Sequence, residues 1–133
     1  MTRRDRRFDC RKGWVLVSRI LVVDDEPDMR FLLRLILGQA GHEVIEAIHG
    51  AAALESVNSS PPQLVVTDMM MPVMGGAELI GQLRSNPVTA DIPILAITGD
   101  PQVAGAADAV LSKPYDPNQV VLATNTLLAK EVD

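Results

Sequence analysis

Residues 64–76 read Leu-Val-Val-Thr-Asp-Met-Met-Met-Pro-Val-Met-Gly-Gly. The four residues before Asp68 are apolar or β-branched, which is typical of a strand buried on both faces of a parallel sheet. Pro72 and the two glycines predict that a loop follows the strand and leads into a short helix. The stretch therefore places one carboxylate at the carboxyl end of a buried strand, and the rest of the chain can be interpreted around it.

Strands and helices are predicted to alternate on both sides of this stretch. Residues 27–38 have the clearest helical periodicity, since apolar side chains recur there at three- and four-residue spacing after Pro27. The predicted strands are 18–23, 43–47 (more polar, as at a sheet edge), 64–67, 94–98 and 109–112. The other predicted helices are 50–57, a short one that follows the loop 69–75 and carries Leu79, Ile80 and Leu83, and 117–130 with Asp116 as its N-cap. This alternation predicts the α/β class, a doubly wound five-stranded parallel sheet with helices on both faces.

One connection is shorter than the alternation of strands and helices requires. Only nine residues, 99–107, separate Thr98 from Asp108, and they include Gly99, Pro101 and Gly105. A crossover between parallel strands with its helix normally needs ten to twelve residues or more. We therefore expect the fourth helix to be shortened or missing.

The charge is unevenly distributed. Residues 1–13 carry a net charge of +4 within a total of −5, so the remaining residues carry −9. We expect residues 1–17 to form a flexible basic tail and residues 18–130 to form the domain. Its acidic character argues against nucleic acid as a partner, and no apolar run is long enough to suggest a membrane span or signal peptide. The single cysteine, Cys10, favours a reducing compartment, so we expect a cytoplasmic protein.

Polar side chains follow the predicted strands where each strand ends. Asp24 and Asp25 follow the first strand, Asp68 ends the third, Thr98 the fourth and Lys113 the fifth. Ligands of open parallel sheets bind outside these carboxyl ends. Each feature alone is common, but the set in this order predicts clustered carboxylates that suit Mg²⁺, with an ammonium and a hydroxyl for phosphoryl oxygens. The chemistry indicated is phosphoryl transfer to a carboxylate.

The same residues carry a resemblance. Val-Val-Asp-Asp-Glu-Pro at 22–27, Val-Val-Thr-Asp-Met-Met-Met-Pro-Val-Met-Gly-Gly at 65–76, Ile-Thr-Gly at 97–99 and Leu-Ser-Lys-Pro at 111–114 resemble the receiver domains of two-component response regulators. The resemblance covers residues 18–130. It implies a flavodoxin-like sheet with strand order 2-1-3-4-5 and a signalling protein, rather than an enzyme, that assists its own phosphorylation and dephosphorylation.

The resemblance also implies a role for each matching position. Asp68 would accept a phosphoryl group from a histidine kinase or a histidine phosphotransfer protein. Magnesium would be held by Asp25, Asp68 and the backbone carbonyl of Met70, with Asp24 acting largely through water. Lys113 would contact the phosphoryl group and Thr98 would turn toward it as the switch hydroxyl, while Pro72 and Gly76 would shape the loop.

Three features depart from the family pattern. Val110 stands where relatives usually have the aromatic residue that rotates with the threonine, the segment 99–107 is short, and Met70 is apolar where a polar side chain is common. We therefore expect competent phosphorylation with an altered output. Met69, Met70, Met71 and Met74 are interpreted as packing residues rather than ligands of a soft metal.

The sequence alone is compatible with three functions. The first is a single-domain receiver, expected to be a monomer, that signals to an unknown downstream protein. The second is a receiver-like interaction module that works without phosphorylation, although none of the acceptor, acidic or lysine positions is lost. The third is a magnesium phosphatase with an aspartyl nucleophile, which would need a second acid where Met70 stands. The first is favoured because the whole motif set is present.

Overall fold

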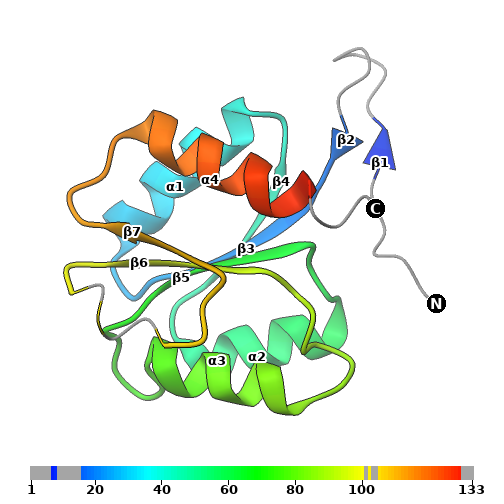
Figure 1. The fold of residues 1–133 in the computed structure, drawn as a ribbon, viewed down its shortest axis with the longest axis vertical. Helices are drawn as coiled ribbons and strands as arrows, with labels where there is room; N and C mark the ends of the chain where they lie inside the picture. The colour runs from blue at the N-terminus through cyan, green and yellow to red at the C-terminus, as the bar shows by residue number, and fades with distance from the viewer. Residues whose placement is uncertain (1–6, 9–15, 101, 103–104, 130–133) are drawn as a thin grey trace.

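A parallel sheet of five strands forms the centre of the computed structural model, which describes residues 7–8, 16–100, 102 and 105–129 (Figure 1). The strands lie in the order β4-β3-β5-β6-β7, which is the predicted order 2-1-3-4-5. Their bounds are β3 Arg19–Val23, β4 Glu43–Ala47, β5 Leu64–Asp68, β6 Ile94–Thr98 and β7 Ala109–Ser112. The helices are α1 Pro27–Gln39, α2 Gly50–Ser59, α3 Gly76–Ser85 and α4 Pro117–Ala129.

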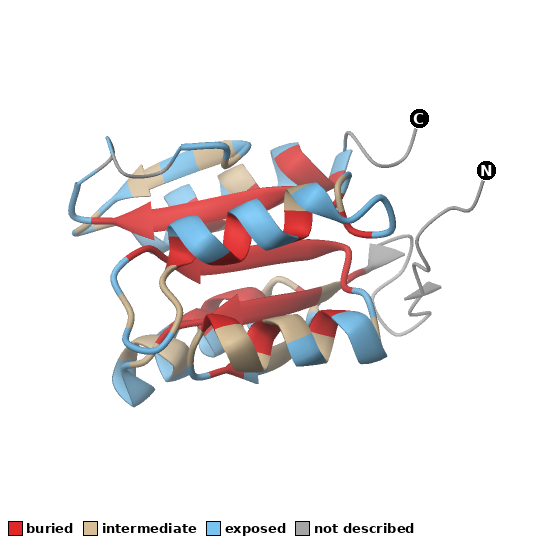
Figure 2. Ribbon diagram, turned by 90° about the horizontal axis from the view of Figure 1, so that it is seen from below, coloured by how far each residue is buried: buried red, intermediate tan, exposed pale blue. Residues whose placement is uncertain are grey.

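Alternate residues of the central strands face two separate apolar layers, because successive side chains of a strand point to opposite faces. In β3, Ile20 and Val22 pack with residues of α1 and α4, whereas Leu21 and Val23 pack with residues of α2 and α3. Figure 1 shows α1 and α4 on one side of the sheet and α2 and α3 on the other. All residues of β5 and β6 are buried, and Figure 2 shows the central strands in red, the colour of buried residues. The predicted doubly wound sheet is confirmed.

The predicted element bounds differ from the observed ones by one or two residues. The first central strand begins at Arg19 rather than at Ser18, and α2 continues to Ser59. Helix α1 passes through Gly38, which has no special conformation, and the chain leaves it at Gly41, whose φ of 98° suits glycine. The Asp116 carboxylate accepts a hydrogen bond of 2.8 Å from the amide of Asn118, as predicted for an N-cap.

The N-terminal segment contains two short strands, β1 Arg7–Phe8 and β2 Leu16–Val17, which pair antiparallel. Residues 1–6 and 9–15 lie outside the described residues, so a flexible basic tail stays a prediction. None of the described helices combines the length and the hydropathy that a membrane-spanning segment requires.

Among its described residues the connection between β6 and β7 contains no α-helix and only a single 3₁₀ residue at Gln102, which agrees with the predicted shortened or missing helix. Residues 101, 103 and 104 of this connection lie outside the described part of the chain. Strand β7 forms one edge of the sheet, and its residues alternate between intermediate and exposed. Val110 is 38% exposed and lies opposite Ala96, which belongs to the apolar layer under α2 and α3.

Helix α3 begins so close to the end of β5 that its first residue must be glycine. A Cβ on Gly76 would lie 2.6 Å from the carbonyl oxygen of Asp68 and 2.8 Å from Cα of Met69. The same approach allows the amide of Gly76 to donate a 3.0 Å hydrogen bond to the carbonyl of Met69. Gly76 therefore fixes the loop that follows Asp68, as predicted.

We expect Gly76→Ala to lower the free energy of unfolding by about 1–3 kcal/mol, because backbone atoms must move to admit the methyl group. Urea denaturation measures this. Gly81 is the matched control, since it is exposed on the same helix and a Cβ there meets nothing within 4 Å. Gly81→Ala should stabilise the protein by about 0.5–1 kcal/mol. Equal stability of Gly76→Ala and the wild-type protein would contradict the close approach.

Candidate functional site

Three carboxylates meet at the carboxyl edge of the sheet. Asp24 and Asp25 follow β3, and Asp68 is the last residue of β5. Strands β3 and β5 are parallel neighbours with Val23 opposite Thr67, so the residues that follow them leave the sheet side by side. One carboxylate oxygen from each aspartate lies within 4.8 Å of the others. The predicted acidic cluster is therefore present.

Asp24 is the most deeply buried of the three and is 2% exposed. Its Oδ1 accepts a hydrogen bond of 2.9 Å from the amide of Glu26. Burial raises the pKa of Asp24 from 3.8 to about 6, and the negative charges of Asp68 and Asp25 add to this rise, while the Glu26 amide and Lys113 oppose it. A positive charge inside the cluster would remove this penalty.

Asp68 is 7% exposed, and the backbone of its own loop orients it. Its Oδ1 accepts a 2.8 Å hydrogen bond from the amide of Met69 and lies 3.4 Å from the amide nitrogen of Met70. Nζ of Lys113 lies 3.5 Å from the same oxygen. Among the described residues no hydrogen bond reaches Oδ2, so this oxygen is available to a metal ion or a phosphoryl group.

The cluster fits Mg²⁺ by the chemistry of its donors. Hard carboxylate oxygens are the ligands that this ion prefers, and it commonly uses only a few of them together with water and substrate oxygens. Three acids packed within 4.8 Å, one of them with a raised pKa, are the surroundings that a divalent cation stabilises. Asp24, Asp25 and Asp68 are thus candidate metal residues, and the backbone carbonyl of Met70 stays a predicted further ligand.

Lys113 and Thr98 reach the same edge from the next two strands. The amide of Lys113 donates a 2.9 Å hydrogen bond to the carbonyl of Thr98, which ties the end of β7 to the end of β6. Oγ1 of Thr98 exchanges hydrogen bonds with Asp100: it accepts from the amide at 3.1 Å and donates to the carbonyl at 3.3 Å. In this conformation the Thr98 hydroxyl is therefore bound to its own loop rather than to the Asp68 carboxylate.

The methionines after Asp68 have different environments. Met69 is buried in the layer under α2 and α3, and Met71 and Met74 pack against that layer. Met70 is 73% exposed. The interpretation as packing residues is confirmed for three of the four and is wrong for Met70, whose apolar side chain lies at the rim of the site.

Two residues of this region were not recognised from the sequence. Arg30 donates a 2.8 Å hydrogen bond to the backbone carbonyl of Asp24, and its Nε lies 3.3 Å from Oε1 of Glu46, so it joins α1, β4 and the acidic cluster. Burial and, to a smaller extent, the negative charge of Asp24 raise the pKa of Tyr115. An arginine on a helix has many possible partners, and an aromatic residue after Lys-Pro resembles an ordinary loop residue, so neither pattern indicated these contacts.

Comparison with known proteins defines the class. The response regulator receiver domain family matches residues 20–125. This span contains all five strands of the parallel sheet except the first residue of β3, and all of the predicted site residues. The chain therefore belongs to the response regulator receiver family, a family of phosphoacceptor signalling modules in two-component systems.

Curated relatives include proteins of very different length. The sensor histidine kinase TmoS of Ectopseudomonas mendocina is 33% identical over 121 residues, which cover 86% of this chain and 12% of that protein. A 14.6 kDa uncharacterised protein of Leptolyngbya boryana is 39% identical over 109 residues, which cover 77% of this chain and 83% of that protein. The phosphate regulon regulator PhoB of Pseudomonas aeruginosa is 32% identical over 84% of this chain, which spans about half of PhoB (52%). Several relatives are thus multi-domain proteins.

Solved structures agree with the fold. A response regulator from Chloroflexus aurantiacus is 33% identical and superposes with a TM-score of 0.81, covering 84% of this chain and 98% of its own. The response regulator TrrA of Thermotoga maritima, solved in complex with Mg²⁺ and BeF, is 32% identical with a TM-score of 0.76, covering 83% and 98%. The flavodoxin-like architecture of the chain is confirmed.

Proposed function

We propose that this protein is a receiver that accepts a phosphoryl group on Asp68 from a histidine kinase or a histidine phosphotransfer protein, in a magnesium-dependent reaction. One observation carries the proposal. Asp68 has its Oδ1 held by the Met69 amide and 3.5 Å from Nζ of Lys113, inside a cluster of three carboxylates at the edge of the sheet. This arrangement provides a nucleophile, a metal site and a cation for phosphoryl oxygens.

In the proposed reaction the phosphorus–nitrogen bond of a phosphohistidine breaks while a bond forms between phosphorus and a carboxylate oxygen of Asp68, and imidazole leaves. The hydrogen bond from Met69 fixes Oδ1 and leaves Oδ2 as the attacking oxygen. Nζ of Lys113 lies where it can bind an oxygen of the transferred group and stabilise its negative charge. Positioning and charge stabilisation of this kind provide most of the catalysis in phosphoryl transfer.

Magnesium, when bound, would neutralise charge on the phosphoryl oxygens and on the acids around it. Asp25 and Asp68 would bind it directly, and Asp24 largely through water. The TrrA relative was solved with Mg²⁺ and BeF, which supports the same ion for this chain. After transfer, the Thr98 hydroxyl would exchange its bonds to Asp100 for one to the phosphoryl group, and this movement would carry the signal to a downstream protein.

Intact-protein mass spectrometry after incubation with a small phosphodonor and Mg²⁺ tests the proposal. We expect the wild-type protein to gain the mass of one phosphoryl group and Asp68→Asn to gain none. Glu78→Gln is the control, since Glu78 is an exposed acid in the first turn of α3 and should not affect the gain. Circular dichroism would establish that each variant is folded.

A second candidate is a receiver-like interaction module that works without phosphorylation. The lack of an α-helix among the described residues between β6 and β7 and the exposed Val110 favour it, because both change the surface on which phosphorylation is usually read. A folded wild-type protein that gains no phosphoryl group would favour this second candidate over the first.

A further inference from the structure

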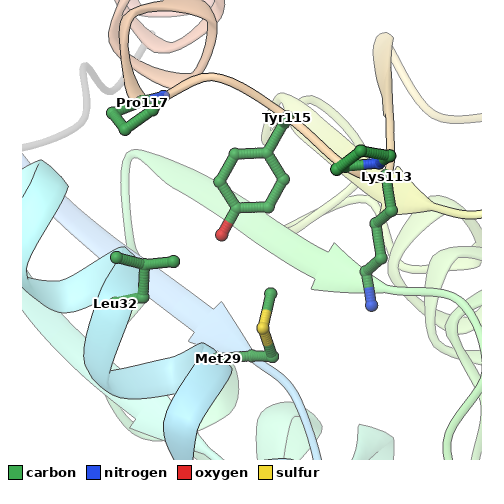
Figure 3. A pocket seen from close by; sticks show the side chains of 6 residues that line it. Met29, Leu32, Lys113, Tyr115 and Pro117 are labelled. Carbon is green, nitrogen blue, oxygen red and sulfur yellow. The ribbon is translucent and has the colours of Figure 1, made fainter.

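Tyr115 forms one wall of a cavity beside the acidic cluster. It follows Lys113 and Pro114 and leads into α4, and its ring faces Met29 and Leu32 of α1 across the cavity (Figure 3). The cavity has a volume of about 440 Å³, and Pro117 and the Lys113 side chain complete its lining. Lys113 therefore borders both this cavity and the Asp68 carboxylate. Tyr115 is the only tyrosine of the chain.

The Tyr115 hydroxyl has no hydrogen-bond partner among the described residues although its oxygen is buried. Leaving a buried hydroxyl unsatisfied costs about 1–3 kcal/mol. Such groups in native proteins usually bind an ordered water, an ion or a ligand. The cavity walls are mostly apolar, so the partner of this hydroxyl must come from the few polar groups nearby or from water.

The cavity that Tyr115 lines adjoins the acidic cluster, because Lys113 of its lining pairs with Asp68. Met29 of its lining lies in the first turn of α1, which follows Asp24 and Asp25. Burial raises the pKa of Tyr115, and the negative charge of Asp24 raises it further. The hydroxyl therefore keeps its proton at neutral pH and can serve as a donor. The described hydrogen bond of the Asp24 carboxylate reaches only Oδ1, from the Glu26 amide, which leaves Oδ2 open to a donor.

We propose that Tyr115 is a positioning residue of the metal site, whose hydroxyl donates a hydrogen bond, directly or through one water, to the Asp24 carboxylate when Mg²⁺ is bound. This inference rests on the proposed function, because it assumes that the cluster binds magnesium. Side chains that orient metal-binding residues in this way typically change metal affinity by about 10–100-fold when they are removed. The contacts of the ring keep the hydroxyl in place, and the cavity has room for a bridging water.

Two measurements on the full chain test the role of Tyr115. In the first, calorimetric titration with Mg²⁺ should show about tenfold weaker binding for Tyr115→Phe, which keeps the ring and removes only the hydroxyl. Leu32→Met is the matched control, because it changes a cavity wall at nearly constant volume and should bind Mg²⁺ as the wild-type protein does. In the second, carbon-13 at the hydroxyl-bearing ring carbon gives one signal from the single tyrosine, and this signal should shift during the titration.

The outcomes separate this inference from the proposed function. If the wild-type protein binds no Mg²⁺, the proposed function fails and the inference fails with it. If the wild-type protein and Tyr115→Phe bind Mg²⁺ equally and the tyrosine signal does not shift, Tyr115 has no positioning role and the proposed function stands. Weaker binding by the variant together with a shifted signal in the wild-type protein supports the inference. The labelled wild-type protein gives a result even if the variant folds poorly.

Discussion

The metal-free protein is expected to lose about 2 kcal/mol of stability as the pH rises from about 4 to about 7, and Asp24→Asn should abolish most of this loss. Burial holds the pKa of Asp24 at about 6 in the folded protein, against 3.8 for an unperturbed aspartate. Each unit of difference corresponds to about 1.4 kcal/mol. Titration of Asp24 in the folded protein is therefore expected to produce this loss.

The direction of this change in stability follows from proton binding by Asp24. Between pH 3.8 and about 6 the folded state keeps a proton on Asp24 that the unfolded chain has already released. Raising the pH through this window therefore favours unfolding. The stabilising contribution is complete below the unfolded pKa and is lost above the folded one. Asparagine carries no proton to lose, and its carbonyl oxygen can still accept the hydrogen bond from the Glu26 amide.

Urea denaturation at pH 4.5 and pH 7.5, in the presence of a chelator, measures this effect. Added Mg²⁺ should restore stability to the wild-type protein at the higher pH, because it binds the folded, charged cluster. The same addition should have a smaller effect on Asp24→Asn. A wild-type protein whose stability does not change over this pH range would refute the prediction.

Replacement of Lys113 by methionine should slow phosphorylation of Asp68 by at least about 100-fold, the usual effect of removing one preorganised charge-stabilising group. Nζ of Lys113 lies 3.5 Å from Oδ1 of Asp68 and is the only ammonium paired with it among the described residues. Methionine retains most of the length of the side chain and its packing. The loss should therefore appear in the chemical step.

Time-resolved mass spectrometry with a small phosphodonor measures the rate, and Mg²⁺ affinity provides the control. The affinity of Lys113→Met for Mg²⁺ should be retained or increased, because the ammonium repels the ion from the cluster. Slow phosphorylation caused only by weakened Mg²⁺ binding would show that Lys113 acts through the metal site. An unchanged rate would show that Lys113 does not stabilise the phosphoryl group during its transfer.

Most of the fold could be predicted because it rests on continuous apolar segments. The four residues before Asp68 and the run 94–97 are buried on both faces, and a burial pattern of this kind is visible in the composition alone. The acidic cluster was also predictable, since the carboxyl ends of parallel strands share one edge. Because β3 and β5 are parallel neighbours, Asp24 directly after β3 and Asp68 at the end of β5 come together at this edge.

The remaining features depend on three-dimensional contacts that leave no pattern in the sequence. Nδ1 of His49 accepts a 3.1 Å hydrogen bond from the Ala52 amide and caps α2, although histidine is not one of the residue types that usually predict an N-cap. Val73 has a φ of 68°, a left-handed conformation that β-branched residues avoid, so its residue type argued against the conformation that the loop imposes. The burial of the Tyr115 hydroxyl depends on how α1 packs against the segment before α4.

Strand β7 packs against the apolar core on only one face, and this has a consequence for motion. Local opening costs least where a segment has few buried apolar contacts, and β7 lies at an edge of the sheet with Val110 and Ser112 exposed. Its backbone amides should therefore exchange with deuterium faster than those of β5. Because Lys113 follows directly after β7, each such opening would separate the ammonium from Asp68. Sub-global unfolding of this edge would then interrupt the site while the central strands keep their structure.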